Sequence, residues 1–293
     1  MHQVIQDAVK AHGLPEQFQE TVTQHYLPLA EKIIARSQWS PAPLVVGVTG
    51  AQGTGKSTLA DFLAILLREM AAFKVAVISL DDLYLTRAER LALGDTVHPL
   101  LKTRGVPGTH DVALGEAVLD ALATASDQQH TALPRFDKAV DDRAPQSQWP
   151  HITGRPDVVI LEGWCLGAGA QDDSALAQPA NSLEASEDKD GAWRQYVNDQ
   201  LKGPYRRFFD RVQYQIFMQA PSMDAVLAWR QKQEHKLKAR VGDGPGIMSD
   251  AQIARFIQHY ERLTRHLLAE HPRNTLVRFE LDDNHSIKAV HHA

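Results

Sequence analysis

The stretch that decides the fold is Leu44-Val45-Val46-Gly47-Val48-Thr49-Gly50-Ala51-Gln52-Gly53-Thr54-Gly55-Lys56-Ser57. It begins with a short apolar run rich in β-branched side chains, which is typical of a strand covered on both faces. It ends in the pattern G-x-x-x-x-G-K-[ST]. A helix is predicted directly afterwards, because one helix face carries the apolar side chains of Leu59, Phe62, Leu63, Leu66 and Met70.

A glycine-rich loop between a strand and a helix is suited to holding phosphate. Backbone N–H groups and the positive end of the helix converge there, and glycine permits backbone angles that a Cβ forbids. Lys56 would reach the terminal phosphates of a nucleotide, and the Ser57 hydroxyl would bind Mg²⁺. The alternative is a glycine-rich turn that binds nothing, but the pattern rarely arises by chance in this context. The candidate nucleotide-binding residues are Gly50, Ala51, Gln52, Gly53, Thr54, Gly55, Lys56, Ser57 and Thr58.

The rest of the chain repeats the alternation of strand and helix. Further apolar runs lie at 75–80, 158–161, 214–218 and 276–281, and helical patterns separate most of them. One such helix is predicted over 222–240, and another begins at Ser249, where Ser-Asp-Ala-Gln has the form of a capping box. Strands that alternate with helices imply βαβ units. We therefore expect an α/β fold with a parallel β-sheet flanked by helices.

The first 43 residues are predicted to be a helical extension. Phe18, Val22, Tyr26, Leu29 and Ile33 recur at the spacing of one helix face, and the extension is expected to end near Pro41. Residues 44–293 would form the second unit. Within it, 94–111 has the composition of a functional loop and 167–191 that of a surface insertion.

Composition excludes several classes of protein. The 293 residues are 43% hydrophobic and 23% charged, with a net charge of −5, so no overall basic field would attract nucleic acid or anionic lipid. There is no run of apolar residues long enough to span a membrane, and the first residues lack a basic segment followed by an apolar one. The single cysteine, Cys165, suits a reducing compartment. We expect a cytoplasmic protein with no nucleic-acid or membrane partner.

Acidic residues follow two of the predicted strands. Asp81 and Asp82 come after the run at 75–80, where a carboxylate could accept the proton of a substrate hydroxyl or help to hold a metal. The alternative is that one of them caps the helix beginning near Thr86. Glu162 ends the run at 158–161, in the arrangement in which a carboxylate meets Mg²⁺. The alternative there is an acid that is merely solvated.

A basic cluster lies on the helix predicted over 222–240. Arg230, Lys232, Lys236, Lys238 and Arg240 are accompanied by Glu234 alone. Such clusters are often solvated faces, but a lid that carries Arg or Lys can stabilise phosphoryl transfer. The spacing does not allow all of these side chains to share one helix face.

These motifs together resemble the phosphoribulokinase, uridine kinase and pantothenate kinase group of P-loop kinases. The shared elements are Gly50 to Ser57, Asp81 to Tyr84, and Leu161 to Gly163. Further segments resemble one branch of that group, the D-glycerate 3-kinase family. They are Arg104 to Asp111, Leu133 to Lys138, Glu162 to Cys165, Trp229 to Lys236, and His259 to Thr264.

The resemblance implies a fold, a reaction and roles for individual residues. It implies a P-loop NTPase-type core with a helical lid, and transfer of a phosphoryl group from ATP, with Mg²⁺, to a primary hydroxyl of a small molecule. The absence of any Lys-x-Asp motif also disfavours GTP. Lys56, Asp81 as base, and Arg230 are the expected catalytic residues, and Ser57 and Glu162 the expected metal ligands. The expected substrate-binding residues are Asp81, Tyr84, Arg104, His110, Arg135 and Lys138.

The acceptor that follows from this resemblance is D-glycerate, which offers a carboxylate and hydroxyl groups. Its site needs a cation or N–H groups together with hydrogen-bonding side chains. Two alternatives stay open. One is a kinase of the same group that acts on another small alcohol, such as a nucleoside, pantothenate or a sugar phosphate. The other is an interaction protein that ATP switches, for which an acceptor site would be superfluous.

Overall fold

A six-stranded sheet forms the centre of the molecule. The computed structural model describes residues 1–39, 43–241 and 248–293, with the side chains of 240 and 241 left out. The strand order is β10-β9-β8-β1-β7-β2, with all neighbours parallel except the antiparallel pair of β9 and β10. The strands are β1 (Leu44–Gly50), β2 (Val75–Ser79), β7 (Val158–Gly163), β8 (Tyr214–Gln219), β9 (Thr275–Leu281) and β10 (Ile287–His292).

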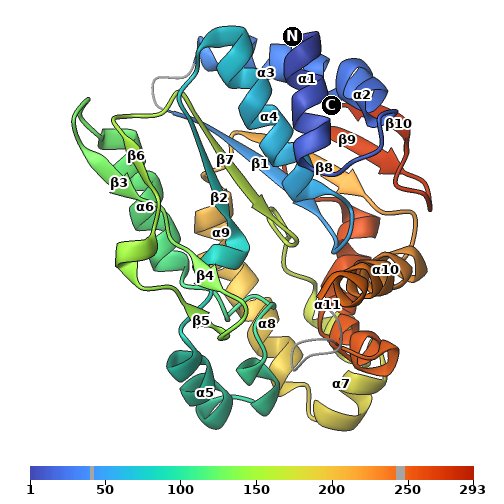
Figure 1. Ribbon diagram of the computed structural model, residues 1–293. Coiled ribbons are helices and arrows are strands. Elements are labelled where there is room, and N and C mark those ends of the chain that lie inside the picture. The colour runs from blue at the N-terminus through green and yellow to red at the C-terminus, as the bar shows by residue number, and fades with distance from the viewer. Residues whose placement is uncertain (40–42, 242–247) are drawn as a thin grey trace.

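Helices cover both faces of this sheet, which confirms the predicted α/β class (Figure 1). The N-terminal helices and α4 pack on one face, and α6 and α9 on the other (Figure 1). The helices are α1 (His2–Ala11), α2 (Phe18–Thr21), α3 (Leu27–Ser37), α4 (Lys56–Ala71), α5 (Arg87–Thr96), α6 (Val112–Thr124), α7 (Ser182–Glu187), α8 (Ala192–Lys202), α9 (Pro204–Phe209), α10 (Met223–Val241) and α11 (Asp250–Glu270).

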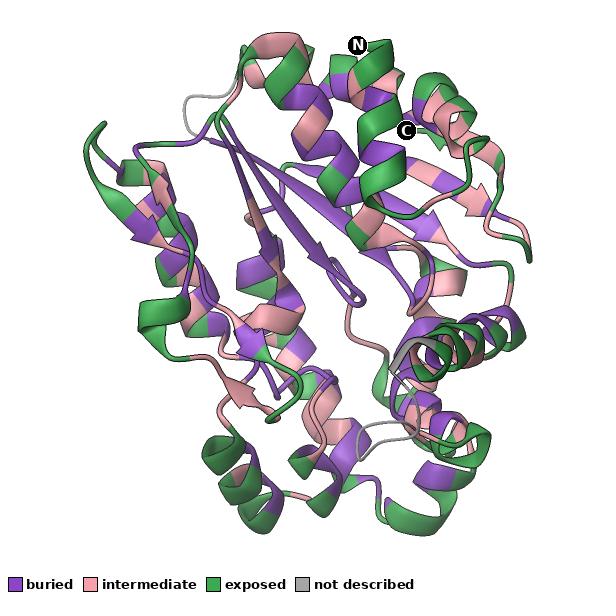
Figure 2. Cartoon of the chain, viewed as in Figure 1, coloured by how far each residue is buried: buried purple, intermediate pink, exposed green. Residues whose placement is uncertain are grey.

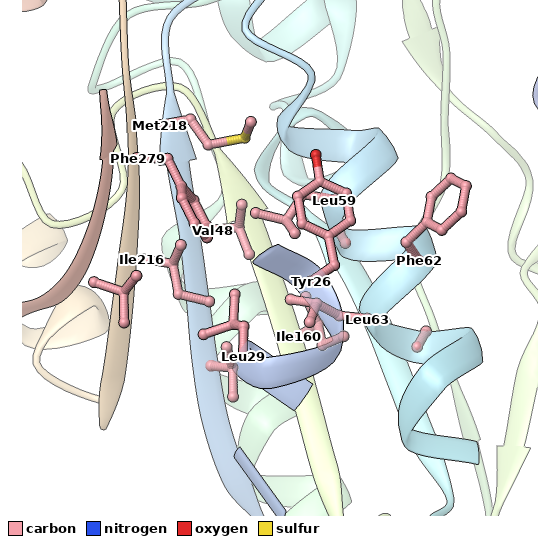
Figure 3. Packing of buried hydrophobic residues seen from close by; sticks show 14 of the residues in the cluster. Tyr26, Leu29, Val48, Leu59, Phe62, Leu63, Ile160, Ile216, Met218 and Phe279 are labelled. Carbon is pink, nitrogen blue, oxygen red and sulfur yellow. The ribbon is translucent and has the colours of Figure 1, made fainter. Parts of the chain in front are cut away.

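The central strands β1 and β7 are buried because their apolar residues face helices on both sides. Every residue of β1 and of β7 is buried, as the colouring of the central strands in Figure 2 shows. On one face the core joins the N-terminal helices to the sheet. Figure 3 shows Tyr26 and Leu29 packed with Val48, Leu59 and Ile160. The N-terminal helices therefore share their core with the sheet.

The apolar periodicity from Phe18 to Ile33 lies within the expected helical extension, and the structure is helical there. The segment forms α2, a π-helical turn (η1, Val22–Tyr26) and α3, in which the N–H of Leu27 bonds to the carbonyl of Val22. The turn widens just before Pro28, which has no N–H to donate to the preceding turn. The helix α1 precedes this segment within the same extension. The expected end near Pro41 lies outside the described residues.

Several short elements also had no periodic signal. They are the 3₁₀ turns η2 (Leu80–Leu83), η3 (Pro99–Lys102), η4 (Gln146–Gln148) and η5 (Asp173–Leu176), and the strands β3 (His130–Ala132), β4 (Phe136–Asp137), β5 (Asp142–Arg143) and β6 (His151–Thr153). The expected loop at 94–111 contains η3, and the expected insertion at 167–191 contains η5 and α7. The capping box predicted at Ser249 is present and begins α11.

A helix that crosses a membrane must be both long and apolar. None of the helices in the described part of the chain meets both requirements.

Candidate active site

The phosphate-loop motif is held in shape by its own buried residues. The hydroxyl of Thr54 donates to the carbonyl of Ala51 at 2.9 Å, and both residues are buried. Gly53 and Gly55 have φ angles of +84° and +87°, which only glycine adopts without strain. Gly55 lies directly before α4, so the N-terminal end of that helix faces the loop. The loop therefore has the backbone form that a phosphate cradle needs.

A cleft of about 940 Å³ opens beside this loop. It lies at the carboxyl ends of β1, β7 and β2, and α10 and α11 bound its other side. Most of the residues singled out in the sequence line it, although they come from widely separated segments. They are Gln52, Gly53, Gly55, Lys56, Ser57, Thr58, Asp81, Tyr84, Arg104, Lys138, Glu162 and Arg230.

Glu162 lies near the phosphate loop with one oxygen available. The parallel pairing of β2 and β7 puts Glu162 opposite Ser79, whose hydroxyl donates to Glu162 Oε1 at 2.5 Å. The other oxygen, Oε2, is buried and has no hydrogen-bond partner among the described residues. Burial raises the pKa of Glu162, and the ammonium group of Lys56 partly opposes this rise. A buried carboxylate oxygen that lacks a partner is suited to a hydrated cation, so these residues fit Mg²⁺.

Asp81 faces the cleft from η2. Its Oδ2 accepts from Lys138 Nζ at 2.6 Å, and its Oδ1 accepts from the Tyr84 hydroxyl at 2.9 Å. Burial would raise the pKa of Asp81, but Lys138, Lys56 and these hydrogen bonds together lower it to about 2. The carboxylate is therefore ionised at neutral pH and can accept a hydrogen bond from a substrate hydroxyl.

Asp82 points elsewhere and has a structural role. Its Oδ1 accepts from the backbone N–H of Phe136 at 3.0 Å, and its Oδ2 accepts from Arg135 at 3.2 Å. Burial raises the pKa of Asp82. Neither acid caps the helix after Thr86, because Thr86 itself forms a capping box with Glu89. The alternative interpretation of the acidic pair as helix caps is therefore wrong.

Two of the residues predicted to bind substrate do not line the cleft. Arg135 is held by Asp82 and by the carbonyl of Pro134. His110 is buried behind Tyr84, with the two rings stacked at a centroid distance of 4.5 Å. Its Nδ1 lies 2.7 Å from the hydroxyl of Tyr205, and burial lowers the pKa of His110 to about 3. A neutral, buried imidazole supports the wall of the cleft and does not attract an anion.

Arg104 and two aromatic rings form the wall opposite Asp81. The guanidinium of Arg104 pairs with Asp141 and remains partly exposed to the cleft. The indole N–H of Trp164 donates to the carbonyl of Gly105 at 2.8 Å, and the hydroxyl of Tyr260 donates to the carbonyl of Arg104 at 3.2 Å. Trp164 and Tyr260 were not predicted as site residues, although both lie in motif segments of the sequence.

The basic helix α10 presents part of its cluster to the cleft. Arg230, Lys232 and Lys236 line it, whereas the side chain of Arg240 lies outside the described residues. Arg230 forms an ion pair with Glu234 at 2.7 Å, and Glu234 Oε1 accepts from the backbone N–H of Met248 at 2.8 Å. Glu234 therefore orients Arg230 and links α10 to the residues that precede α11.

A stacked ring pair lies beside the phosphate loop and was not predicted. The rings of Trp229 and His285 have a centroid distance of 4.1 Å and an interplanar angle of 27°. The indole N–H of Trp229 donates to the carbonyl of Asp283 at 2.8 Å. A Cβ at Gly53 would lie only 2.7 Å from Cβ of Trp229, so the indole packs directly on the loop. Both rings line the cleft, and together they offer an aromatic surface.

Comparison with known proteins gives relatives of one kind. No family model matches the chain. It is 36% identical over 225 residues to "Uncharacterized kinase mug58" of Schizosaccharomyces pombe, covering 74% of this chain and 78% of that protein. It is 30% identical over 263 residues to "Probable ATP-dependent kinase TDA10" of Saccharomyces cerevisiae, covering 82% and 84%.

The fold has a solved counterpart as well. The structure of D-glycerate 3-kinase from Cryptococcus neoformans var. grubii superposes with a TM-score of 0.74 and 28% sequence identity, covering 93% of this chain and 99% of that one. The likeness therefore extends over most of the chain. Together with the kinase relatives, it confirms the fold, the family and the class of reaction expected from the motifs. The chain is a phosphotransferase that belongs to the D-glycerate 3-kinase family of P-loop kinases.

Proposed function

We propose that this enzyme transfers the γ-phosphoryl group of ATP to the primary hydroxyl of D-glycerate, giving 3-phosphoglycerate and ADP. The observation that carries the proposal is the environment of Asp81. This ionised carboxylate faces the cleft between Lys138, which bonds it at 2.6 Å, and Lys56 of the phosphate loop. A base for a hydroxyl, a cation for a carboxylate and a lysine for phosphates are thus grouped in one cleft.

The nucleotide phosphates would lie on the loop from Gly50 to Ser57, with Lys56 at the terminal phosphates. Ser57 and Glu162 would hold Mg²⁺, since both line the cleft and Glu162 has a buried oxygen without a partner among the residues described. When bound, the ion would offset charge on the phosphate oxygens. The ring pair of Trp229 and His285 offers a surface for the base.

The acceptor would bind between Asp81 and the wall formed by Arg104. D-glycerate has only three carbons, so a cation beside its terminal hydroxyl is also within reach of its carboxylate. Lys138 has this position, and its side chain is 58% exposed, so the ammonium group has room to turn from Asp81 to the substrate. Arg104 supplies a second cation, partly compensated by Asp141. Charge-assisted hydrogen bonds of this kind are the strong ones.

In the transfer step, the hydroxyl oxygen forms a bond to the γ-phosphorus and the bond from that phosphorus to the β,γ-bridging oxygen breaks. The hydroxyl proton moves to the carboxylate of Asp81, and ADP leaves with the bridging oxygen. Arg230, oriented by Glu234, would stabilise charge on the transferring group. Lys138 affects this step indirectly: when it turns to the substrate carboxylate, Asp81 loses a cationic partner and becomes a stronger base.

A panel of acceptors tests the proposal. Release of ADP with Mg-ATP is measured for D-glycerate, L-glycerate, glycerol, pantothenate and uridine. Glycerol is the matched control, because it keeps the primary hydroxyl and lacks the carboxylate. We expect D-glycerate to be turned over fastest and glycerol at least about tenfold less efficiently, since a charge-assisted contact contributes about 1.5–3 kcal/mol.

The other outcomes separate the alternatives. Faster turnover of pantothenate or uridine would make the enzyme a kinase for another small alcohol. ADP release that no acceptor accelerates would favour the nucleotide-switched protein. Replacing Lys138 by Met should raise the KM for D-glycerate by about 10- to 100-fold, because the acceptor carboxylate loses its cationic partner. The KM for ATP should stay nearly unchanged, because the hydrogen bond of Lys138 goes to Asp81 and not to the phosphate loop.

A further inference from the structure

The cleft has two chemically different ends, which follow from the strand order. The strands β7 and β2 lie on one side of β1 and bring Glu162 and Asp81 to the cleft. The strands β8 and β9 lie on the other side, where α10 follows β8 and the turn after β9 contains His285. One end therefore carries the acids Glu162 and Asp81, and the other carries the stacked rings of Trp229 and His285 beside the basic residues of α10.

A further ring in the cleft comes from the N-terminal part of the chain. His12 directly follows α1 and lines the same cleft as the phosphate loop. Its ring lies 5.2 Å from that of Phe62, tilted by 35°, and its Nε2 lies 3.9 Å from Asp61 Oδ2. Phe62 and Asp61 belong to α4, shortly after Thr58, which also lines the cleft. The imidazole therefore lies beside the helix that begins at the phosphate loop.

The position of His12 is fixed by packing. Ile5, Ala8 and Val9 anchor α1 in the core that covers the sheet, and the backbone N–H of His12 bonds to the carbonyl of Ala8 at 3.0 Å. The same core includes Tyr26, whose ring contacts that of Phe279 in β9. The N-terminal helices thus extend over the sheet as far as β9, which lies on the side of the stacked rings.

We propose that His12 contacts the nucleoside part of the bound nucleotide, so that the N-terminal helix α1 contributes directly to nucleotide binding. The inference rests on the proposed ATP site. With the phosphates on the loop and the acceptor at Asp81, the ribose and base must extend away from Asp81. The surface available there includes the rings of Trp229 and His285, on which a purine stacks. The side chain of His12 is 27% exposed and supported by Phe62, so one part of the ring is free for such a contact.

Two ligands separate a nucleoside contact from general support of the loop. ADP and inorganic tripolyphosphate are titrated calorimetrically into the wild-type protein and into His12→Ala, with His2→Ala as the matched control at the exposed start of the same helix. Tripolyphosphate offers phosphates without a base. We expect His12→Ala to bind ADP about fivefold more weakly and to bind tripolyphosphate as the wild type does. The loss of about fivefold corresponds to the lower end of the range of base–aromatic stacking energies.

A third variant tests the chemistry of the contact. His12→Phe keeps an aromatic ring on Phe62 and should restore most of the ADP affinity. Unchanged ADP affinity in His12→Ala would overturn the inference, and so would an equal loss of ADP and tripolyphosphate affinity, which would mean that His12 only supports α4. If the wild type binds neither ADP nor tripolyphosphate, the proposed nucleotide site itself is refuted. Thermal unfolding of each variant verifies that it is folded.

Discussion

Replacing Asp81 by Asn tests the acceptor side of the site most directly. The substitution keeps the size of the side chain and one oxygen that can accept from Tyr84 or Lys138, but it removes the negative charge and the proton acceptor. Asp81 touches no part of the phosphate loop by hydrogen bond, so the loop should keep its form. The charge nearest to it on the nucleotide side is Lys56. ADP binding should therefore be unchanged or slightly tighter.

The size of the effect follows from the role and the pKa of Asp81. General-base assistance contributes about 10²- to 10⁴-fold to a rate. The lowered pKa of about 2 makes Asp81 a weak base before substrate binds, which places the loss near 10²-fold. If the substrate carboxylate draws Lys138 away from Asp81, the pKa rises and the loss moves towards 10⁴-fold. Transition states of this kind are often loose, so a purely orienting Asp81 would cost less.

The assay is single-turnover and steady-state ADP release with D-glycerate, and Asp82→Asn is the control. Asn at position 82 can still accept from the N–H of Phe136, and the ion pair with Arg135 is partly exposed, so stability should fall by no more than about 1 kcal/mol and turnover should stay within about twofold. Near-normal turnover in Asp81→Asn would refute the base assignment. An inactive Asp82→Asn beside an active Asp81→Asn would show that the two acids have been assigned the wrong way round.

Three further predictions concern the nucleotide side of the cleft. Lys56→Ala should abolish transfer and leave the unfolding temperature nearly unchanged, because Lys56 binds phosphate and supports no core; full activity would rule out the phosphate-loop assignment. At limiting Mg²⁺, activity should fall as pH drops through the raised pKa of Glu162, since the protonated acid holds no cation, and added Mg²⁺ should move that fall to lower pH. Glu162→Gln should raise the Mg²⁺ requirement and remove this coupling, and an unchanged metal titration would make Glu162 a structural acid. Glu234→Ala should lower the free energy of unfolding by about 3 kcal/mol, measured by urea titration, because Arg230 loses a largely buried partner and Met248 its acceptor; no loss would mean that the pair is solvated.

The parts of the fold that the sequence predicted are those that residues adjacent in the chain determine. The run from Leu44 to Ser57 determines a strand, a loop and a helix by local sequence, and the phosphate-loop geometry followed directly. The strand β7 was visible as an apolar run because helices bury it on both faces, whereas β9 alternates because only one of its faces is buried. The edge strand β10 was not visible, since most of its residues are partly or fully exposed and its composition is polar. The split between α2 and α3 could have been inferred from Pro28.

The sequence predicted many of the residues of the candidate site, but it did not predict which of them contact one another. Asp81 and Asp82 are neighbours of the same kind, and only the position of Phe136 decides which one remains available to a substrate. His110 has the chemistry of an anion ligand, yet Tyr205, far along the chain, holds it in the wall. The pairing of Ser79 with Glu162 requires the register of two strands, which the sequence does not contain. Contacts of this long range are determined by packing.

The charge of the cleft shows how an acidic chain can bind anionic substrates. The protein carries a net charge of −5, so long-range attraction of ATP or glycerate is not available. Among the described residues that line the cleft, however, six are Lys or Arg and three are Asp or Glu. Two of the cations, Lys138 and Arg230, already pair with acids of the cleft, Asp81 and Glu234. Substrate binding can then proceed by exchange of partners: an incoming anion replaces a protein carboxylate at a cation, and the released carboxylate becomes free to act. With Asp81 as the proposed base, this exchange would make its basicity depend on occupation of the acceptor site and would limit its reactivity until the acceptor is bound.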